Sequence, residues 1–240
     1  MELSPQLLES LKVYKDKIKK DVSFLINDQD HPKKESFLTF LNGIASIFDK
    51  LDVRIEKTRY NQYSPLTLEI ASDDQPAGLL FSGIPGGHEF NSLILGTLQA
   101  GGSKINLDES LIDQIKQIDR KINFETLVSL SCENCPDVVQ NLNQFALISK
   151  NITNHTIDGN LYPKLVKERD VQSVPSVFVE GEMVASGRIS TANIIKKLVE
   201  KGLIRTKPKK SKLPIQDVVV IGGGPAGVSS AIYAARKGLN

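Results

Sequence analysis

Two cysteines separated by two residues are the part of this sequence best suited to chemistry. The segment Ser-Cys-Glu-Asn-Cys-Pro covers residues 131–136, where a predicted strand meets a predicted helix. Unpaired N–H groups at the start of a helix stabilise an anion, so this location favours the thiolate of Cys132, the form that attacks disulfides. Cys135, one helical turn further, can form a disulfide with Cys132 and release a bound partner. We predict that Cys132 is the nucleophile and Cys135 the resolving residue.

Two other interpretations of the cysteine pair stay open at this point. A structural zinc site needs four ligands, and two would have to come from His31, His88 and His155, none of which has zinc-finger spacing. The pair could also be two buried, inert thiols. The strand–helix location favours redox chemistry over both, so we expect no bound metal.

A proline that lies 40 residues after Cys135 is expected beside the pair. Pro175 follows Val174 and precedes a predicted strand. Only about 5% of X–Pro bonds are cis in general, but we expect this one to be cis. A cis Pro175 would fix the chain beside Cys132 and present the backbone of Val174 to an incoming peptide. The alternative is a turn proline that starts an edge strand.

Glu89, which opens a predicted helix in the first half of the chain, is a candidate acid or base. The helix dipole alone favours a carboxylate there. The functional interpretation is that Glu89 reaches toward Cys132 and assists proton transfer or tunes the thiolate.

The elements that would position these residues occur twice in the same order. Apolar periodicity predicts helices and strands over residues 4–19 (helix), 21–27 (strand), 34–48 (helix), 52–59, 66–71 and 78–82 (strands) and 89–99 (helix), then over 108–119 (helix), 122–130 (strand), 135–148 (helix), 151–157 (strand), 161–169 (helix), 176–180 and 183–186 (strands) and 191–201 (helix). This order predicts an α/β protein with two fused thioredoxin/glutaredoxin-like units, residues 1–101 and 102–201. The first unit has no cysteine.

The remaining residues differ in composition from the two units. Residues 202–214 are rich in Lys and Pro and predict a flexible basic linker. Residues 215–240 predict a strand at 217–221, a G-x-G-x-x-G turn with Gly222, Gly224 and Gly227, and a helix at 228–236. This is the start of a Rossmann-type FAD- or NAD-binding domain, so we expect the chain to be a piece of a larger protein.

Charge and apolar content narrow the function classes. Residues 201–240 carry eight basic and one acidic side chain, whereas residues 1–200 are mildly acidic, which argues against nucleic-acid binding by the main body. No apolar run reaches the roughly 18 residues of a membrane span, and no secretory signal is visible. We therefore expect a cytoplasmic protein that binds neither nucleic acid nor membrane.

Several of these motifs, taken together, resemble those of the alkyl hydroperoxide reductase F subunits. The resemblance is carried by residues 130–140, Gly87-His88-Glu89-Phe90, Ile157-Asp158-Gly159, residues 174–179, Gly187-Arg188 and the glycine turn at 222–227. It implies an N-terminal redox module followed by a thioredoxin-reductase-like flavoprotein part. It also implies that electrons pass from NADH through FAD and a second CxxC to Cys132 and Cys135, and then to the disulfide of the reductase's C subunit, a two-cysteine peroxiredoxin that reduces peroxides. It further implies that the full-length protein is a homodimer.

Two departures from the family pattern affect these expectations. Glu133 stands where some members have His, and a carboxylate there disfavours the thiolate of Cys132. Most of the FAD site and the whole NAD site would lie beyond Asn240, so we expect no bound cofactor here and thiol–disulfide exchange alone. The rival functions are a general thioredoxin-like reductase and a docking module without redox chemistry.

Overall fold

A computed structural model describes residues 3–56, 65–204 and 216–239. The chain divides into two compact units, Met1–Thr206 and Lys207–Asn240. The first unit is built on one eight-stranded sheet in the order β2-β1-β3-β4-β6-β5-β7-β8. Its strands are β1 (Val22–Asn27), β2 (Leu51–Glu56), β3 (Thr67–Ser72), β4 (Gln75–Ser82), β5 (Ile122–Val128), β6 (Ile152–Asp158), β7 (Ser176–Val179) and β8 (Glu182–Ser186).

The two halves of the sheet have the same topology. β1 pairs in parallel with β2 and antiparallel with β3, and β3 continues into the antiparallel β4. β5 repeats these relations with β6, β7 and β8. The halves meet where β4 pairs in parallel with β6, from Leu79↔Asn154 to Ser82↔Ile157. The predicted fold class, two fused thioredoxin-like units, is confirmed. The predicted boundary at residue 101 stays a prediction.

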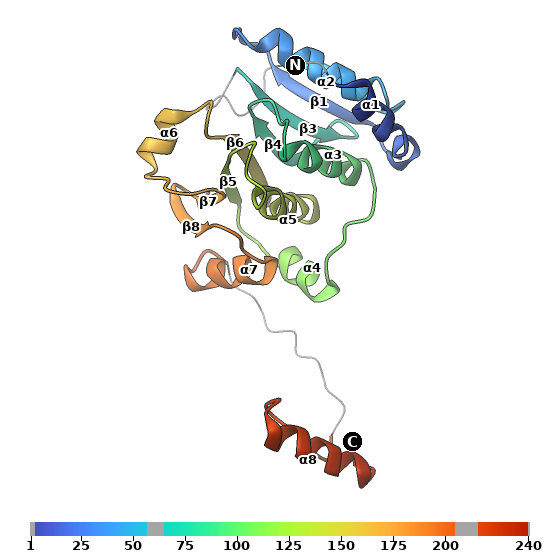
Figure 1. Ribbon diagram of the computed structural model, residues 1–240, viewed down its shortest axis with the longest axis vertical. Helices are drawn as coiled ribbons and strands as arrows, with labels where there is room; N and C mark the ends of the chain where they lie inside the picture. Colours follow the sequence, from blue (N-terminus) through green and yellow to red (C-terminus); the bar gives the residue numbers. More distant parts are fainter. Residues whose placement is uncertain (1–2, 57–64, 205–215, 240) are drawn as a thin grey trace. The chain divides into compact units, whose positions relative to one another are not determined.

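Helices flank the sheet (Figure 1). They are α1 (Pro5–Lys12), α2 (Lys34–Ala45), α3 (Glu89–Ala100), α4 (Glu109–Lys116), α5 (Cys135–Ile148), α6 (Pro163–Glu168) and α7 (Thr191–Glu200). α3 packs against α5 where the two halves join. Phe124 faces α5, where its ring meets Phe145 edge-on with centroids 6.3 Å apart. Leu127 points to the opposite face, because strand side chains alternate, and packs with residues of α6.

One predicted helix is shorter than its pattern indicated. α1 ends at Lys12, and a 3-10 turn over Lys15–Lys17 follows in place of a continuous helix to residue 19. The break allows Leu11 and Ile18 to be buried, while Tyr14, whose helical spacing would put it on the same face, is 43% exposed. Of the helices in the described part of the chain, none has the length and apolar character that crossing a membrane requires.

The second unit, described from residue 216 to 239, contains one helix, α8 (Pro225–Arg236). Residues 218–224, which include most of the predicted strand, form no strand and have no strand partner among the described residues. Val219 and Ile221 are 72% and 94% exposed. The start of a Rossmann-type domain therefore stays a prediction. Most of the predicted linker, residues 205–214, lies outside the described residues.

Candidate functional site

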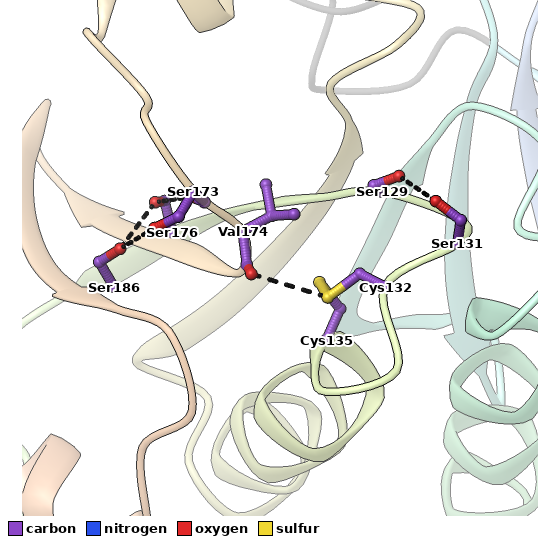
Figure 2. Close-up of a disulfide and its surroundings, with 8 residues drawn as sticks. All are labelled: Ser129, Ser131, Cys132, Cys135, Ser173, Val174, Ser176 and Ser186. Carbon is purple, nitrogen blue, oxygen red and sulfur yellow. Dashed lines mark hydrogen bonds between the residues drawn. A yellow bond between two sulfur atoms is a disulfide. The ribbon is translucent and has the colours of Figure 1, made fainter.

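The cysteine loop connects the end of β5 to the start of α5. β5 ends at Val128 and α5 begins at Cys135, with Pro136 in its first turn, as the sequence predicted. Cys132 and Cys135 form a disulfide with their Cα atoms 5.5 Å apart (Figure 2). Cys135 is fully buried, whereas Cys132 is half-buried. A partner molecule can therefore reach the sulfur of Cys132 more easily than that of Cys135.

A second loop faces the disulfide from the other side. The Val174–Pro175 peptide bond is cis, as predicted, and the carbonyl oxygen of Val174 lies 3.7 Å from Sγ of Cys132 (Figure 2). Three serine hydroxyls fix this loop: Ser173 Oγ lies 2.9 Å from Ser186 Oγ, and Ser176 Oγ donates to the carbonyl of Ser173 at 2.7 Å. The backbone that a bound peptide would meet beside Cys132 is thus held in place.

Charged side chains complete this side of the site. The N–H of Gly187 donates to the carbonyl of Pro175 at 2.8 Å, so the loop after β8 is joined to the cis-proline loop. The next residue, Arg188, places Nη2 3.2 Å from Oδ2 of Asp137 in the first turn of α5. A cavity of about 280 Å³ adjoins this ion pair. The sequence motifs include Arg188 only as part of a Gly-Arg pair and did not predict its ion pair with Asp137.

The first half of the sheet contacts the cysteine loop through a turn. The N–H of His88 donates to the carbonyl of Leu130 at 3.0 Å. Gly87 precedes it with a φ of 54°, and a Cβ on this residue would collide with the same carbonyl oxygen. Only glycine satisfies both requirements without strain. A spacing pattern cannot reveal this contact, because it joins residues more than 40 positions apart that belong to different halves.

Glu89 begins α3, as predicted, but its side chain is 1% exposed. Burial raises its pKa to about 7, because a charge is poorly solvated in the interior. The polar side chain beside the carboxyl is Ser92, which partly offsets the effect of burial, and among the described residues the carboxyl makes no hydrogen bond to Cys132. It lines a cavity of about 10 Å³, room for about one water, together with Leu130 and Asp158. Glu89 therefore lies behind the cysteine loop, and its role stays a prediction.

The polar network behind β5 is neutral. Thr126 Oγ1 donates to Asn154 Oδ1 at 2.8 Å, and Asn154 Nδ2 donates to Asn143 Oδ1 at 2.8 Å. All three side chains are at most 1% exposed. These groups do not titrate. The small cavity is lined by two buried carboxyls, Glu89 and Asp158, and burial raises the pKa of both.

The histidines that a zinc site would need have other surroundings. His155 is buried with Nε2 2.6 Å from Ser82 Oγ, and burial lowers its pKa to about 3. His31 Nδ1 accepts from the N–H of Lys33 at 3.1 Å. Within the described ranges, no group of three or more His, Cys, Asp or Glu residues could hold a metal ion. A larger cavity, of about 700 Å³, is lined by Lys20 and Lys121 among others and includes no residue of the cysteine loop.

The glycine turn of the second unit has features that a dinucleotide would require. Gly222 has a φ of 107°, Gly224 is the N-cap of α8, and a Cβ on Gly227 would collide with the carbonyl oxygen of Gly222. A tight glycine turn of this kind lets a pyrophosphate approach the N-terminus of a helix.

Comparisons with known proteins agree with this geometry. A family model described as a thioredoxin domain matches residues 122–200. The F subunit of alkyl hydroperoxide reductase in Pseudomonas aeruginosa is 38% identical over 99% of this chain, and a protein named NADH dehydrogenase in Ferdinandcohnia aciditolerans is 38% identical over 100% of it. The chain spans 45% of the length of each of these relatives.

A solved structure extends the agreement to the fold. The NTD_N/C domain of alkylhydroperoxide reductase AhpF from Enterococcus faecalis has a TM-score of 0.74 and 29% identity, covering 82% of this chain and 99% of that one. Duplicated thioredoxin-like topology and a CxxC disulfide beside a cis-proline define a thiol–disulfide oxidoreductase module. More specifically, the chain is similar to the F subunits of alkyl hydroperoxide reductases and, in fold, to the NTD_N/C domain of one of them.

Proposed function

We propose that this chain passes electrons from a flavoprotein domain to the disulfide of a two-cysteine peroxiredoxin and thereby supports peroxide removal. The observation that carries the proposal is the disulfide between a half-buried Cys132 and a buried Cys135, with the carbonyl of Val174 3.7 Å from the outer sulfur. An outer nucleophile and an inner resolving thiol are what disulfide exchange requires.

The exchange begins with the pair in its reduced form. The thiolate of Cys132 attacks one sulfur of the partner's disulfide, that S–S bond breaks, and the partner's second sulfur leaves as a thiolate. The thiolate of Cys135 then attacks Cys132 Sγ and frees the partner's other sulfur. Two electrons have moved to the partner, which takes up two protons, and the Cys132–Cys135 disulfide has re-formed. Pro175 holds the backbone of Val174 where the partner's peptide would lie.

Glu89 is proposed to exchange protons with this site. Its raised pKa, about 7, lets the carboxyl hold or release a proton near neutral pH, and it shares a cavity with Leu130 of the cysteine loop. In a Glu89→Gln variant we expect a changed pH profile of the exchange rate and a changed thiol pKa at Cys132. Unchanged values for both would exclude this role.

The source of electrons is proposed to be a flavoprotein part that follows the glycine turn. Gly222, Gly224 and Gly227 would hold the pyrophosphate of FAD, and FAD when bound supplies the two-electron step between NADH and a thiol pair. The proposed partners are therefore the protein's own flavoprotein domain and a peroxiredoxin. That the full-length protein is a homodimer and cytoplasmic is proposed from the family resemblance alone.

Single-turnover transfer tests the function directly. The chain is reduced with dithiothreitol, desalted and mixed with oxidised two-cysteine peroxiredoxin, and thiols on each protein are counted over time. We expect transfer by the native chain, none by Cys132→Ser, and a trapped mixed disulfide with Cys135→Ser. Transfer at the native rate by Cys132→Ser would exclude the assignment, and a partner trapped only by Cys132→Ser would reverse the two roles.

The same assay separates the rival functions. A general reductase would reduce an unrelated protein disulfide, such as that of insulin, as fast as the peroxiredoxin. A docking module would bind the peroxiredoxin without changing either thiol count. Faster reduction of the peroxiredoxin than of insulin supports a dedicated partner.

A further inference from the structure

A series of contacts links the outer sulfur to an exposed cation, Arg188. Cys132 Sγ faces the carbonyl of Val174, the carbonyl of Pro175 accepts from Gly187, and Arg188 reaches Asp137 at the start of α5. Asp137 is two residues from Cys135, the second cysteine of the disulfide. Arg188 is thus joined to the cis-proline loop on one side and to the first turn of α5 on the other, the two segments that flank Cys132.

The guanidinium of Arg188 is available to a ligand. Its side chain is 73% exposed, and within the described part of the chain its one charged partner is Asp137, itself 57% exposed. An exposed ion pair contributes little stability and is easily broken. Asp137 also lies in the first turn of α5, where the helix dipole stabilises a carboxylate without Arg188.

The space beside Arg188 is suited to a polar segment. The cavity of about 280 Å³ is lined by Gln140, Asn141 and Gln144 of α5 and by Ser190, besides the ion pair. These neutral side chains can donate hydrogen bonds to a carboxylate or a peptide carbonyl. The planar guanidinium can bind a carboxylate through two parallel hydrogen bonds, which adds geometric selectivity.

We propose that Arg188 is a specificity-determining residue that pairs with a carboxylate next to the disulfide of the protein partner, displacing Asp137. This inference rests on the proposed disulfide exchange at Cys132. Arg188 contributes to partner binding and takes no part in the sulfur chemistry, so its effect is expected in KM and not in kcat.

Matched peptide disulfides test the proposal. Three symmetric peptide dimers of equal length, each linked by one cysteine disulfide, carry Glu, Gln or Lys on both sides of the cysteine. The full 240-residue chain is kept reduced by dithiothreitol, and KM and kcat are measured for each dimer. For the native chain we expect a KM about tenfold lower for the Glu dimer than for the Gln dimer, a difference of about 1.4 kcal/mol, with similar kcat. Salt should weaken the preference.

Variants assign the preference to one side chain. Arg188→Gln should remove the KM difference between the Glu and Gln dimers. Arg188→Lys should retain only part of that difference, because an ammonium cannot form the two parallel hydrogen bonds of a planar guanidinium. Asp137→Asn should strengthen it by removing the competing carboxylate. The matched control is Arg120→Gln, which breaks another exposed pair, to Glu180 at 2.8 Å, before β5 begins and so at the opposite end of that strand from Cys132.

The results distinguish a failure of the role proposed for Arg188 from a failure of the proposed disulfide exchange. Equal KM values for the Glu and Gln dimers, a lower KM for the Lys dimer, or a preference that survives in Arg188→Gln would each overturn the role of Arg188 while leaving exchange intact. Failure to reduce any dimer would instead refute disulfide exchange, and the role of Arg188 with it.

Discussion

The same strand–loop–helix unit occurs twice in this protein, with cysteines in only one copy. β1 ends at Asn27 and α2 begins at Lys34, so the first loop covers residues 28–33. β5 ends at Val128 and α5 begins at Cys135, so the second loop, residues 129–134, has the same length. Lys34 therefore occupies the position of Cys135. The framework alone does not create a redox site, because both copies share it.

In the first copy, the loop that corresponds to the cysteine loop has local hydrogen bonds and no cysteines. The side-chain oxygen of Asn27 accepts from the N–H of Gln29 at 2.9 Å, and the ammonium of Lys34 donates to the carbonyl of Asn27. Burial lowers the pKa of Lys34. The contact of the first copy with the cysteine loop comes from the turn of Gly87 and His88, which follows β4, and the buried Glu89 begins the next helix. One copy thus contains the cysteine pair, and the other holds the cysteine loop through a backbone hydrogen bond.

The largest expected effect tests whether the two copies fold as one body. Phe40 of α2 is 1% exposed and meets Phe90 edge-on with ring centroids 6.1 Å apart. Phe40→Ala should cost about 3–5 kcal/mol of unfolding free energy. Because β4 and β6 pair across the junction, denaturant unfolding followed by hydrogen exchange should still show one transition that includes α5. Ile55→Ala, at a side chain 56% exposed, is the control and should change stability by about 0.5 kcal/mol or less. Two separate transitions would show that the copies are independent.

The next effect concerns the carboxyl that the first copy contributes. Burial raises the pKa of Glu89 to about 7 from 4.5, so the folded state holds a proton that the unfolded state has released between these values. The contribution of the Glu89 carboxyl to the free energy of unfolding is therefore at its full value below about pH 4.5. It falls by about 3 kcal/mol as the pH rises to about 7. Glu89→Gln should remove this fall, leaving the variant more stable than the native chain at about pH 8. Parallel stability curves for the two proteins across this range would show that Glu89 titrates normally.

A smaller effect tests the contact between the copies. Gly87→Ala should cost about 2 kcal/mol, since it combines a left-handed backbone with a collision against the carbonyl of Leu130. The matched control is Gly202→Ala: its φ is 67°, but a Cβ there meets nothing within 4 Å. The control should lose about 1 kcal/mol and exchange disulfides at the native rate, whereas Gly87→Ala should exchange about tenfold more slowly because the cysteine loop shifts. Equal rates for the two variants would mean that the turn does not position the loop.

Local patterns predicted most of this architecture. Apolar periodicity placed β1, α3 and α5 within a residue or two of their observed bounds, and the cysteine spacing predicted the disulfide. The sequence did not predict the end of α1, because Tyr14 has the spacing of a buried residue yet lies in solvent.

Contacts between distant segments were beyond such patterns. The hydrogen bond from His88 to Leu130 and the ion pair between Arg188 and Asp137 each join residues more than 40 positions apart. No periodicity encodes them, because they depend on how β4 pairs with β6 and how the loop after β8 meets the first turn of α5. The apolar run at 217–221 predicted a strand, but a strand needs a neighbouring strand to pair with, and the described residues provide none.

The smallest expected difference contrasts one ion-paired arginine from each copy. Arg54 in β2 contacts Asp52 at 2.8 Å and Asp74 at 2.7 Å, but its side chain is 41% exposed. Arg169 contacts Glu125 at 2.8 Å, is 20% exposed, and lies 5.1 Å from the centroid of the Phe178 ring. Arg169→Gln should cost about 1–2 kcal/mol, because it removes both a charge-assisted hydrogen bond and a cation–π contact in a partly buried place.

Arg54→Gln should change stability much less, because water and salt already screen its two contacts. Raising the salt concentration during denaturant unfolding separates the two cases. We expect the small effect of Arg54→Gln to disappear at high salt and most of the effect of Arg169→Gln to persist. If both effects were equal and equally sensitive to salt, burial would not be what distinguishes the ion pairs of the two copies.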